Sequence, residues 1–249
     1  MLSEHLSQAQ RVQPRLQLSL AHSEEEVREA QRLRYKVFVE EMGAHPTCRE
    51  PGIDRDIYDP YCDHLLVRER DSNEVIGTYR MLTAARAKEV GGFYSRNEFD
   101  LTRLANLSER TVEVGRSCVH PDYRSGAVIA MLWEGLAKYM QTHNAEYLMG
   151  CASISISDGG HVAASLYQRL KAESMCPIEW RVFPRYPLPL DRLEQNLEAA
   201  TPALIKGYLR AGAYICGDPA WDPDFNTADL LILLPKSRIT ARYAKHFIG

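Results

Sequence analysis

The sequence has few of the features that mark a membrane, secreted or metal-binding protein. Its six cysteines form no Cys-x-x-Cys pair and have no histidine at ligand spacing, which favours reduced cytoplasmic thiols over zinc sites or disulfides. The longest apolar run, Leu230 to Leu234, is far too short to cross a bilayer. Residues 1–17 contain no apolar signal-peptide core. We therefore expect a cytoplasmic protein, free or peripheral at the inner membrane face.

The sequence also lacks a strong excess of either positive or negative charge. The formal net charge is −3 and no basic tract dominates, which argues against a general nucleic-acid binder. The Asp-Gly-x5-Glu pattern of a calcium loop is absent, and no metal is expected. What remains is an ordinary globular composition, 45% hydrophobic and 25% charged, in a chain of 249 residues. That length suits one large domain, or a core with an extension.

Hydrophobic periodicity predicts alternating strands and helices. Ser23 and Glu26 form a capping box, which opens a helix that should end at Gly43. Turn residues 71–73 join two antiparallel strands. The predicted strands are 16–20, 64–70, 74–82, one from 111, 147–157, 180–183 and 230–234, and further helices are predicted at 126–143, 161–171, 202–211 and the basic C-terminus. This pattern indicates a mixed sheet in an α/β fold.

The stretch from Thr111 to Trp133 carries the strongest functional signals. It begins as a strand, turns through a polar segment and continues as an apolar helix, an arrangement in which phosphates bind to the helix N-terminus. The strand also contains Glu113 and Arg116. Because residues three apart in a regular strand face opposite sides, these two share a cavity only if Gly115 introduces a β-bulge. We predict irregular pairing at residues 114–116.

Arginine and aspartate residues form a second pattern. Arg34 interrupts the apolar face of the first helix, so it either extends to the rim or is buried against carboxylates. The next loop, EPGIDRDIYDPYCD, carries Asp54, Asp56, Asp59 and Asp63. An acidic loop that follows a helix with an inward arginine predicts pairing between the two, although a solvated surface would give the same composition.

The turn VHPDYRSG, between a strand and an apolar helix, resembles motif A of the GCN5-related N-acetyltransferases (GNAT). The usual pattern is Arg/Gln-x-x-Gly-x-Gly/Ala, and Arg124, Gly126 and Ala127 form a shorter version of it. The resemblance implies a GNAT-like fold with a mixed, mostly antiparallel central sheet flanked by helices. It also implies that a pantetheine-linked acyl donor is held by Val119, Arg124, Ser125, Gly126, Ala127 and Val128. The incomplete glycine pattern favours acyl carrier protein over coenzyme A as the donor's carrier.

Two narrower resemblances follow. The segments RYKVF, DRDIYD, GTYRML and VEVGRSCV, together with Phe99, resemble the acyl-homoserine-lactone synthases in order and spacing. HPDYRSGAVIAMLW followed by YLMGCASIS is most similar to the hemolysin-like ornithine N-acyltransferases of bacterial ornithine-lipid synthesis. The resemblance covers a core at residues 16–185, with a flexible lead-in at 1–15 and a C-terminal extension at 186–249 that completes the domain.

The second resemblance implies transfer of a 3-hydroxyacyl chain from acyl carrier protein to the α-amine of L-ornithine, giving lyso-ornithine lipid. The donor is carried on the phosphopantetheine of the carrier protein, so no bound cofactor is expected. The chain lacks the His-x-x-x-x-Asp signature of acyltransferases that esterify a second chain. A separate O-acyltransferase should therefore complete the lipid.

Four alternatives stay open. Acyl-homoserine-lactone synthesis from S-adenosylmethionine is opposed by the extra C-terminal segment and by a missing Trp, since Ala44 and His45 follow Gly43. The acceptor could instead be another amino acid, such as glycine or lysine. A CoA-dependent small-molecule N-acetyltransferase is opposed by the incomplete glycine pattern. The fourth alternative is a non-catalytic module that binds carrier protein or lipid. It is opposed by the inward array of paired charges, which such a module would not need.

Attack of an amine on a thioester needs proton removal, a positioned donor and a stabilised oxyanion. Glu113 is the first candidate for the base, directly or through water, unless it forms a structural salt bridge; Asp59 is the second. We expect a network of arginines 34, 80 and 116 with Asp56, Asp59 and Glu113, in which one arginine binds the amino acid's carboxylate. The predicted catalytic residues are Glu113, Asp59 and Arg116, and the predicted substrate-binding residues are Arg34, Phe38, Asp56, Arg80 and Phe99.

Three weaker hypotheses concern other residues. Cys118 or Cys151 could form an acyl-enzyme, although no Cys-His arrangement is evident. The loop with Asp218, Trp221, Asp222 and Asp224 could hold a side-chain ammonium such as that of ornithine, or be an ordinary surface loop. The C-terminal helix, with Arg238, Arg242 and Lys245, could contact anionic lipid or the carrier protein, but a solvated face explains it as well.

Overall fold

The computed structural model describes residues 15–45, 48 and 50–239, and one large sheet organises them. The strand order is β1-β2-β3-β5-β6-β10-β8, with β9 paired to β10. Every pair in this sheet is antiparallel except β5 with β6. The bounds are β1 Leu16–Leu20, β2 Asp63–Glu69, β3 Val75–Thr83, β5 Thr111–Val119, β6 Tyr147–Ser155, β8 Tyr214–Ile215, β9 Ala220–Asp222 and β10 Thr227–Pro235. The predicted mixed, mostly antiparallel sheet is confirmed.

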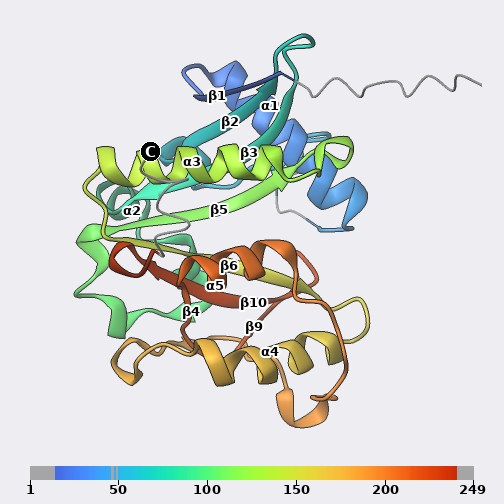
Figure 1. The fold of residues 1–249 in the computed structure, drawn as a ribbon, viewed down its shortest axis with the longest axis vertical. Helices are drawn as coiled ribbons and strands as arrows, with labels where there is room; N and C mark the ends of the chain where they lie inside the picture. Colours follow the sequence, from blue (N-terminus) through green and yellow to red (C-terminus); the bar gives the residue numbers. More distant parts are fainter. Residues whose placement is uncertain (1–14, 46–47, 49, 240–249) are drawn as a thin grey trace, which may run out of the picture.

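Helices cover both faces of the sheet (Figure 1). Apolar side chains of α3, α4 and α5 pack in one cluster against one face, whereas those of α1 and α2 pack against the other. The bounds are α1 Glu24–Arg34, α2 Ala84–Val90, α3 Ala127–Thr142, α4 His161–Ser174 and α5 Ala203–Ala211. Shorter 3-10 segments lie at Asp59–Tyr61, Tyr94–Asn97, Thr102–Leu104, Ser108–Arg110, Pro121–Tyr123, Ile178–Trp180, Leu190–Arg192 and Lys236–Arg238.

The first helix begins as predicted and changes its winding before it ends. The Glu26 N–H donates to the Ser23 hydroxyl at 3.2 Å, which is the predicted cap. After α1 the chain continues as a π-helix, Tyr35–Glu41, with a five-residue bond from the Met42 N–H to the Val37 carbonyl at 3.1 Å. π-helical turns are rare and are often found at functional sites. Here the wider turn carries Phe38 and Glu41.

The centre of the sheet is buried on both faces. Along β10, Leu230, Ile232 and Leu234 pack toward α3, α4 and α5, whereas Leu231 and Leu233 pack toward the other side. A continuous apolar run is typical of a strand covered on both faces. The predicted strand 230–234 is therefore correct but too short. β10 pairs with β6 along all nine residues, so segment 186–249 contributes a central strand.

β5 and β6 pair only at their beginnings. Residues 111–113 pair with residues 147–149, and beyond them the strands part (Figure 1). On the other edge of β5, Gly115 pairs with Arg80 and Cys118 with Thr78, so two residues lie opposite Tyr79. One of these two, Arg116, has a φ of 50°, in the left-handed region. The predicted irregularity is confirmed, with the extra residue at 116–117.

Several local predictions differ from the structure. The predicted strand 180–183 is wrong, because Ile178–Trp180 forms a 3-10 turn and only Phe183–Pro184 (β7) pairs, with Phe99–Asp100 (β4). The predicted loop 217–229 contains β9 and the start of β10. The lead-in and the basic C-terminal helix fall almost wholly outside the described residues. Within the described ranges, no helix is long and apolar enough to cross a membrane.

Candidate active site

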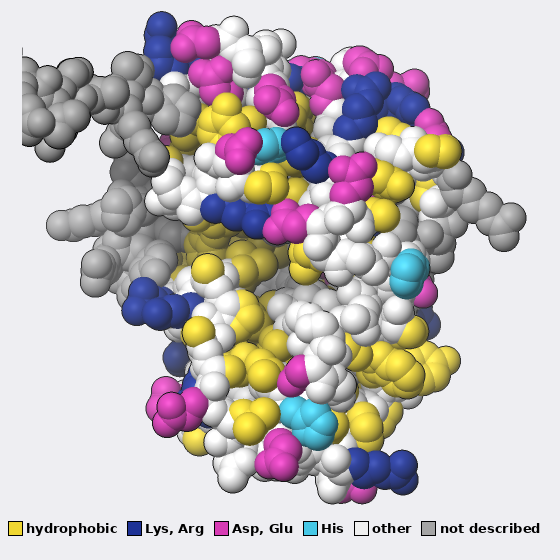
Figure 2. All heavy atoms as spheres, turned by 90° about the vertical axis from the view of Figure 1, so that its right-hand side faces the viewer, with side chains coloured by type: hydrophobic (Ala, Val, Ile, Leu, Met, Phe, Trp, Pro, Cys, Tyr) yellow, Lys and Arg dark blue, Asp and Glu magenta, His cyan; other side chains and the backbone are white. Residues whose placement is uncertain are grey.

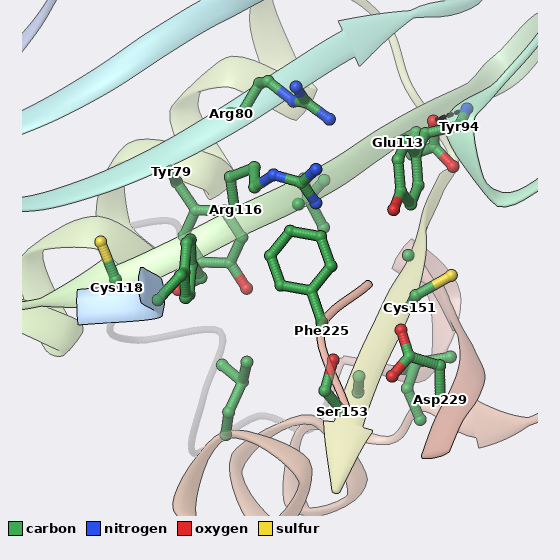
Figure 3. Close-up of a pocket in the computed structure, with 18 of the residues that line it drawn as sticks. Tyr79, Arg80, Tyr94, Glu113, Arg116, Cys118, Cys151, Ser153, Phe225 and Asp229 are labelled. Carbon is green, nitrogen blue, oxygen red and sulfur yellow. Dashed lines mark hydrogen bonds between the residues drawn. The ribbon is translucent and has the colours of Figure 1, made fainter. Parts of the chain in front are cut away.

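A cavity of about 300 Å³ opens where β5 and β6 part. Its walls include residues 114–119 of β5 and 148–153 of β6. Phe38 and Phe225 also line it, with ring centroids 6.0 Å apart in an edge-to-face arrangement. The face seen in Figure 2 is hollowed across its middle, with hydrophobic side chains in the recess and charged side chains around it. Figure 3 shows the polar residues that point into the cavity.

Beside the cavity, Arg34 is fully buried. Its Nε donates to Asp54 Oδ2 and its Nη1 to Asp59 Oδ1, both at 2.7 Å. Of the two interpretations of Arg34, burial against carboxylates is therefore confirmed. Arg34 does not line the cavity, so it positions other residues rather than contacting a substrate.

Two further arginines complete the network. Arg80 Nη1 donates to Asp56 Oδ1 at 2.7 Å and to Asp59 Oδ2 at 3.0 Å. Arg116 Nη2 lies 3.2 Å from Asp56 Oδ2, and its Nε lies 3.4 Å from Asp54 Oδ2. Three guanidinium groups thus meet three carboxylates, and their formal charges cancel. The third acid is Asp54, which corrects the prediction that Glu113 would take this place.

Asp59 is held too firmly to suit a general base. Burial alone would raise its pKa, but the Arg34 and Arg80 guanidinium groups beside it hold the pKa well below its usual range. Its carboxylate also accepts the Asp56 N–H at 2.9 Å. A carboxylate this strongly stabilised in its charged form has little tendency to accept a proton. The geometry thus argues against Asp59 as the base.

Glu113 is the last residue of β5 that pairs with β6, and only 4% of its surface is exposed. Its carboxylate accepts the Ser95 N–H at 2.8 Å, the Ser95 hydroxyl and the Tyr94 N–H. Burial raises the pKa of Glu113 above its ordinary value, and these hydrogen bonds offset part of that rise. A raised pKa in a cavity is typical of carboxylates that act as acid–base catalysts.

Arg116 reaches the cavity because of the bulge that contains it. Its guanidinium carbon lies 4.4 Å from the centroid of the Phe225 ring and 5.1 Å from that of Tyr94, so aromatic faces hold it in place. Among the described residues, its Nε has no hydrogen-bond partner. Glu113 and Arg116 therefore line one cavity despite their spacing of three (Figure 3).

The predicted donor turn leads into α3 at Gly126, whose φ of 103° favours glycine. No described side chain caps this N-terminus, which leaves its first N–H groups for a ligand. Arg124 forms a bidentate pair with Glu41, at 2.6 and 2.7 Å. Of the six predicted donor-binding residues, only Val119 and Arg124 line the cavity, while Ser125, Gly126, Ala127 and Val128 lie outside its lining.

The two aromatic residues that were predicted to bind substrate lie in different places in the structure. Phe38, on the π-helix, lines the cavity. Phe99, on β4, is fully buried in a hydrophobic cluster and does not line the cavity, so the fold separates it from the candidate site. Asp56 lies beside the cavity and reaches it only through its contacts with Arg80 and Arg116.

Sequence reasoning missed Glu98 and Asp229, which form a second group of acids together with Asp222 of the suspected loop. All three are buried, and Asp222 and Asp229 line the cavity. Within the suspected loop, Asp222 is the member that the fold brings inward, while Trp221 stays 47% exposed. One sequence feature could have identified Asp229: it directly precedes the apolar run of β10. Like Glu113, it is an acid within a predominantly apolar strand.

Comparisons with known proteins identify the family of this chain. Residues 33–134 match a family model described as an acetyltransferase (GNAT) domain. The chain is 37% identical over 244 residues to the L-ornithine N(alpha)-acyltransferase of Rhodobacter capsulatus, covering 93% of this chain and 94% of the relative. It is 34% identical over 248 residues to the L-ornithine N(alpha)-acyltransferase of Brucella abortus, covering 93% and 88%. The chain belongs to this acyltransferase family.

The fold of this acyltransferase is shared more widely. The crystal structure of the AHL synthase LasI matches it with a TM-score of 0.56 and 12% identity, covering 95% of this chain and 96% of that chain. At that identity the likeness concerns the fold alone. The predicted resemblance to the ornithine N-acyltransferases is therefore confirmed, and the acyl-homoserine-lactone synthase LasI shares the fold.

The cysteines of this acyltransferase are poorly suited to an acyl-enzyme. Burial raises the pKa of the Cys118 thiol to about 12 and that of Cys151 well above its ordinary value. The thiolate is the nucleophilic form of cysteine, so both residues are held in their unreactive form. Direct transfer from donor to amine fits the geometry better than a covalent intermediate.

Proposed function

We propose that this acyltransferase moves a 3-hydroxyacyl chain from the phosphopantetheine thioester of acyl carrier protein to the α-amine of L-ornithine, giving lyso-ornithine lipid. Support comes from the named activity of its relatives, which are L-ornithine N(alpha)-acyltransferases. The observation that carries the proposal is the position of Glu113, a buried carboxylate of raised pKa where β5 and β6 part.

In the proposed reaction, the slot between β5 and β6 receives the pantetheine arm, and the N-terminus of α3 lies near its phosphate. Arg116 binds the carboxylate of the amino acid, because its guanidinium faces the cavity. Glu113 removes a proton from the α-amine, directly or through water. The amine nitrogen then attacks the thioester carbon, a C–N bond forms, the C–S bond breaks, and the proton leaves with the pantetheine thiol.

The oxyanion of the tetrahedral intermediate needs hydrogen-bond donors. A β-bulge leaves one residue outside the ladder, and its N–H is available for such a role. The bulge at residues 116–117 lies within the cavity wall, beside Glu113 and Arg116. The same irregularity would thus place both the arginine and a backbone donor at the thioester.

The test is an assay of purified protein with 3-hydroxyacyl carrier protein and a panel of L-ornithine, L-lysine, glycine and S-adenosylmethionine. We expect N-acylated ornithine by mass spectrometry, with one free carrier-protein thiol released per product. Turnover of acetyl-CoA without turnover of the acyl carrier protein would contradict the proposed donor. A lactone product from S-adenosylmethionine would contradict the proposed acceptor.

A further inference from the structure

The second acid group is unusual because no basic side chain of the described residues pairs with it. Glu98 follows the 3-10 turn at Tyr94–Asn97, Asp222 ends β9, and Asp229 lies in β10. Their exposed fractions are 8%, 8% and 4%. None of the three forms an ion pair with any residue that the structure describes. Buried charges are normally paired, so three acids without a cation need an explanation.

Glu98 has the least satisfied carboxylate of the three, and its close polar neighbours are Cys151 and Asp229. Among the described residues, neither of its carboxylate oxygens has a hydrogen-bond partner. Asp229 accepts the Thr227 hydroxyl at 2.8 Å. Asp222 accepts the N–H groups of Asp224 at 2.9 Å and Phe225 at 3.2 Å. Glu98 and Asp229 therefore have unused acceptor capacity close together, and Asp222 lies near enough to act on the pKa of both, an arrangement that a bound cation would complete.

The acids lie next to the reaction centre. Oxygens of Glu98 and Asp229 and the sulfur of Cys151 all lie within 4.8 Å of one another. The Cys151 thiol donates to the Ser95 hydroxyl at 3.4 Å, and the Ser95 hydroxyl donates to Glu113. One cysteine and one serine thus separate the acids from Glu113. Figure 3 shows Cys151 and Asp229 side by side on neighbouring strands of the cavity wall.

We propose that Glu98, Asp222 and Asp229 bind the side-chain ammonium of the acceptor amino acid, an inference that rests on the proposed function. The ligand class is an α-amino acid with a terminal ammonium, in which the α-carboxylate meets Arg116 and the α-amine meets Glu113. Glycine and serine offer no group for this subsite. Carboxylates keep the terminal nitrogen charged and hence non-nucleophilic, which directs acylation to the α-nitrogen.

A divalent metal is the competing occupant, since Glu98, Cys151 and Asp229 are spaced closely enough to ligate one. Soft metals bind cysteine as the thiolate. The pKa of the Cys151 thiol is raised by burial and by the neighbouring acids, which opposes thiolate formation. An ammonium needs only the carboxylates, so the observations favour it, and metal binding becomes an outcome of the test.

The experiment compares L-ornithine with L-norvaline, which has the same carbon chain without the terminal nitrogen. Calorimetry measures binding of each, and the carrier-protein assay measures kcat and KM. We expect wild-type protein to prefer ornithine by about 10²-fold or more in both binding and kcat/KM, because norvaline leaves buried acids without their partner. In Glu98→Gln, the KM for ornithine should rise about tenfold with a smaller change in kcat, since the contact is present before and during reaction.

Asp229→Asn is the second variant and should reproduce the loss, and the share of product acylated on the terminal nitrogen should rise in both. Asp100→Asn, an exposed acid two residues beyond Glu98, is the matched control and should behave as wild type. Equal binding of ornithine and norvaline would overturn the inference, as would an unchanged ratio in folded Glu98→Gln. So would a stoichiometric metal whose removal by chelation abolishes the preference for ornithine. If no amino acid is acylated, the proposed function fails. The ratio of ornithine to norvaline affinity measured by calorimetry then still tests the ammonium subsite.

Discussion

Two groups of three acids lie beside one cavity, all of them buried except the half-buried Asp56, and they differ in what faces them. Asp54, Asp56 and Asp59 meet three arginines, and Arg34 and Arg80 hold the pKa of Asp59 low. The second group forms no ion pair with an arginine or lysine among the described residues, and burial together with mutual repulsion raises the pKa of its members, that of Asp229 to about 6. The first group is complete without a ligand. The second becomes complete only when a cation enters.

Glu113 lies between the two groups and should give the largest effect. Glu113→Gln keeps the shape and the bonds from Ser95 but removes the base, so kcat should fall about 10²–10⁴-fold. In the wild type, activity should rise as pH increases through the raised pKa of Glu113, because only the ionised carboxylate accepts a proton. Steady-state rates across a pH series measure both, and the rise should be absent in the variant. Full activity of Glu113→Gln would remove it as the base.

The completeness of the first group is tested by Arg34→Met. Two carboxylates lose a buried partner, so the free energy of unfolding should fall by about 3–5 kcal/mol. Urea denaturation followed by circular dichroism measures it. Arg32→Met is the matched control, because its pair with Glu25 is half exposed and should change stability by under about 1 kcal/mol. Equal effects of the two variants would show that burial of the network contributes nothing.

Arg116 belongs to the first group yet faces the cavity, so its effect should be kinetic. Arg116→Lys retains the charge but loses the planar fork, and the KM for ornithine should rise about 10–100-fold. Arg110→Lys, which alters an exposed pair with Glu146, should leave the KM unchanged. Steady-state kinetics in which both variants keep the wild-type KM would place the amino-acid carboxylate elsewhere.

The smallest expected effect is on the pH dependence of folding stability, which should differ between the two groups of acids. The pKa of Asp229 is raised in the folded state, so the folded protein binds a proton that the unfolded chain has released, and stability falls as pH rises from about 4 through about 6. Asp229→Asn should lack this loss and gain on the order of 1–2 kcal/mol relative to wild type between pH 4 and pH 7. Thermal melts at both values measure it, with Asp71→Asn in the exposed β2–β3 turn as control. An equal gain in both variants would contradict the assignment.

Local signals in the sequence predicted much of the fold. The Ser23 cap, the hairpin around Asn73 and the helix after Gly126 each depend on residues near one another in the chain, and each lies where predicted. The bulge was also predictable, because Gly115 separates two charged residues that would otherwise face opposite sides. The change from α- to π-winding at Tyr35 had no comparable local signal.

Contacts between distant segments were not predictable from this single sequence. The place of Asp54 in the arginine network depends on how one loop folds over α1, and the pattern of acids alone does not choose among its members. Asp229 lies near Cys151 because β10 pairs with β6, whereas Glu98 reaches the same place from the segment before β4. Phe99 was predicted to bind substrate, but it lies on β4, which pairs with β7, and is fully buried.

The pairing of β10 with β6 also has a consequence for how the protein is made. β10 is the last strand along the described chain, yet it supplies Asp229 and braces one wall of the cavity. During synthesis, β6 leaves the ribosome long before its partner and presents an open, largely apolar edge in the meantime. Open edges of this kind recruit other chains. A chain stopped short of Thr227 should therefore be both inactive and prone to aggregation, however intact its earlier segments are.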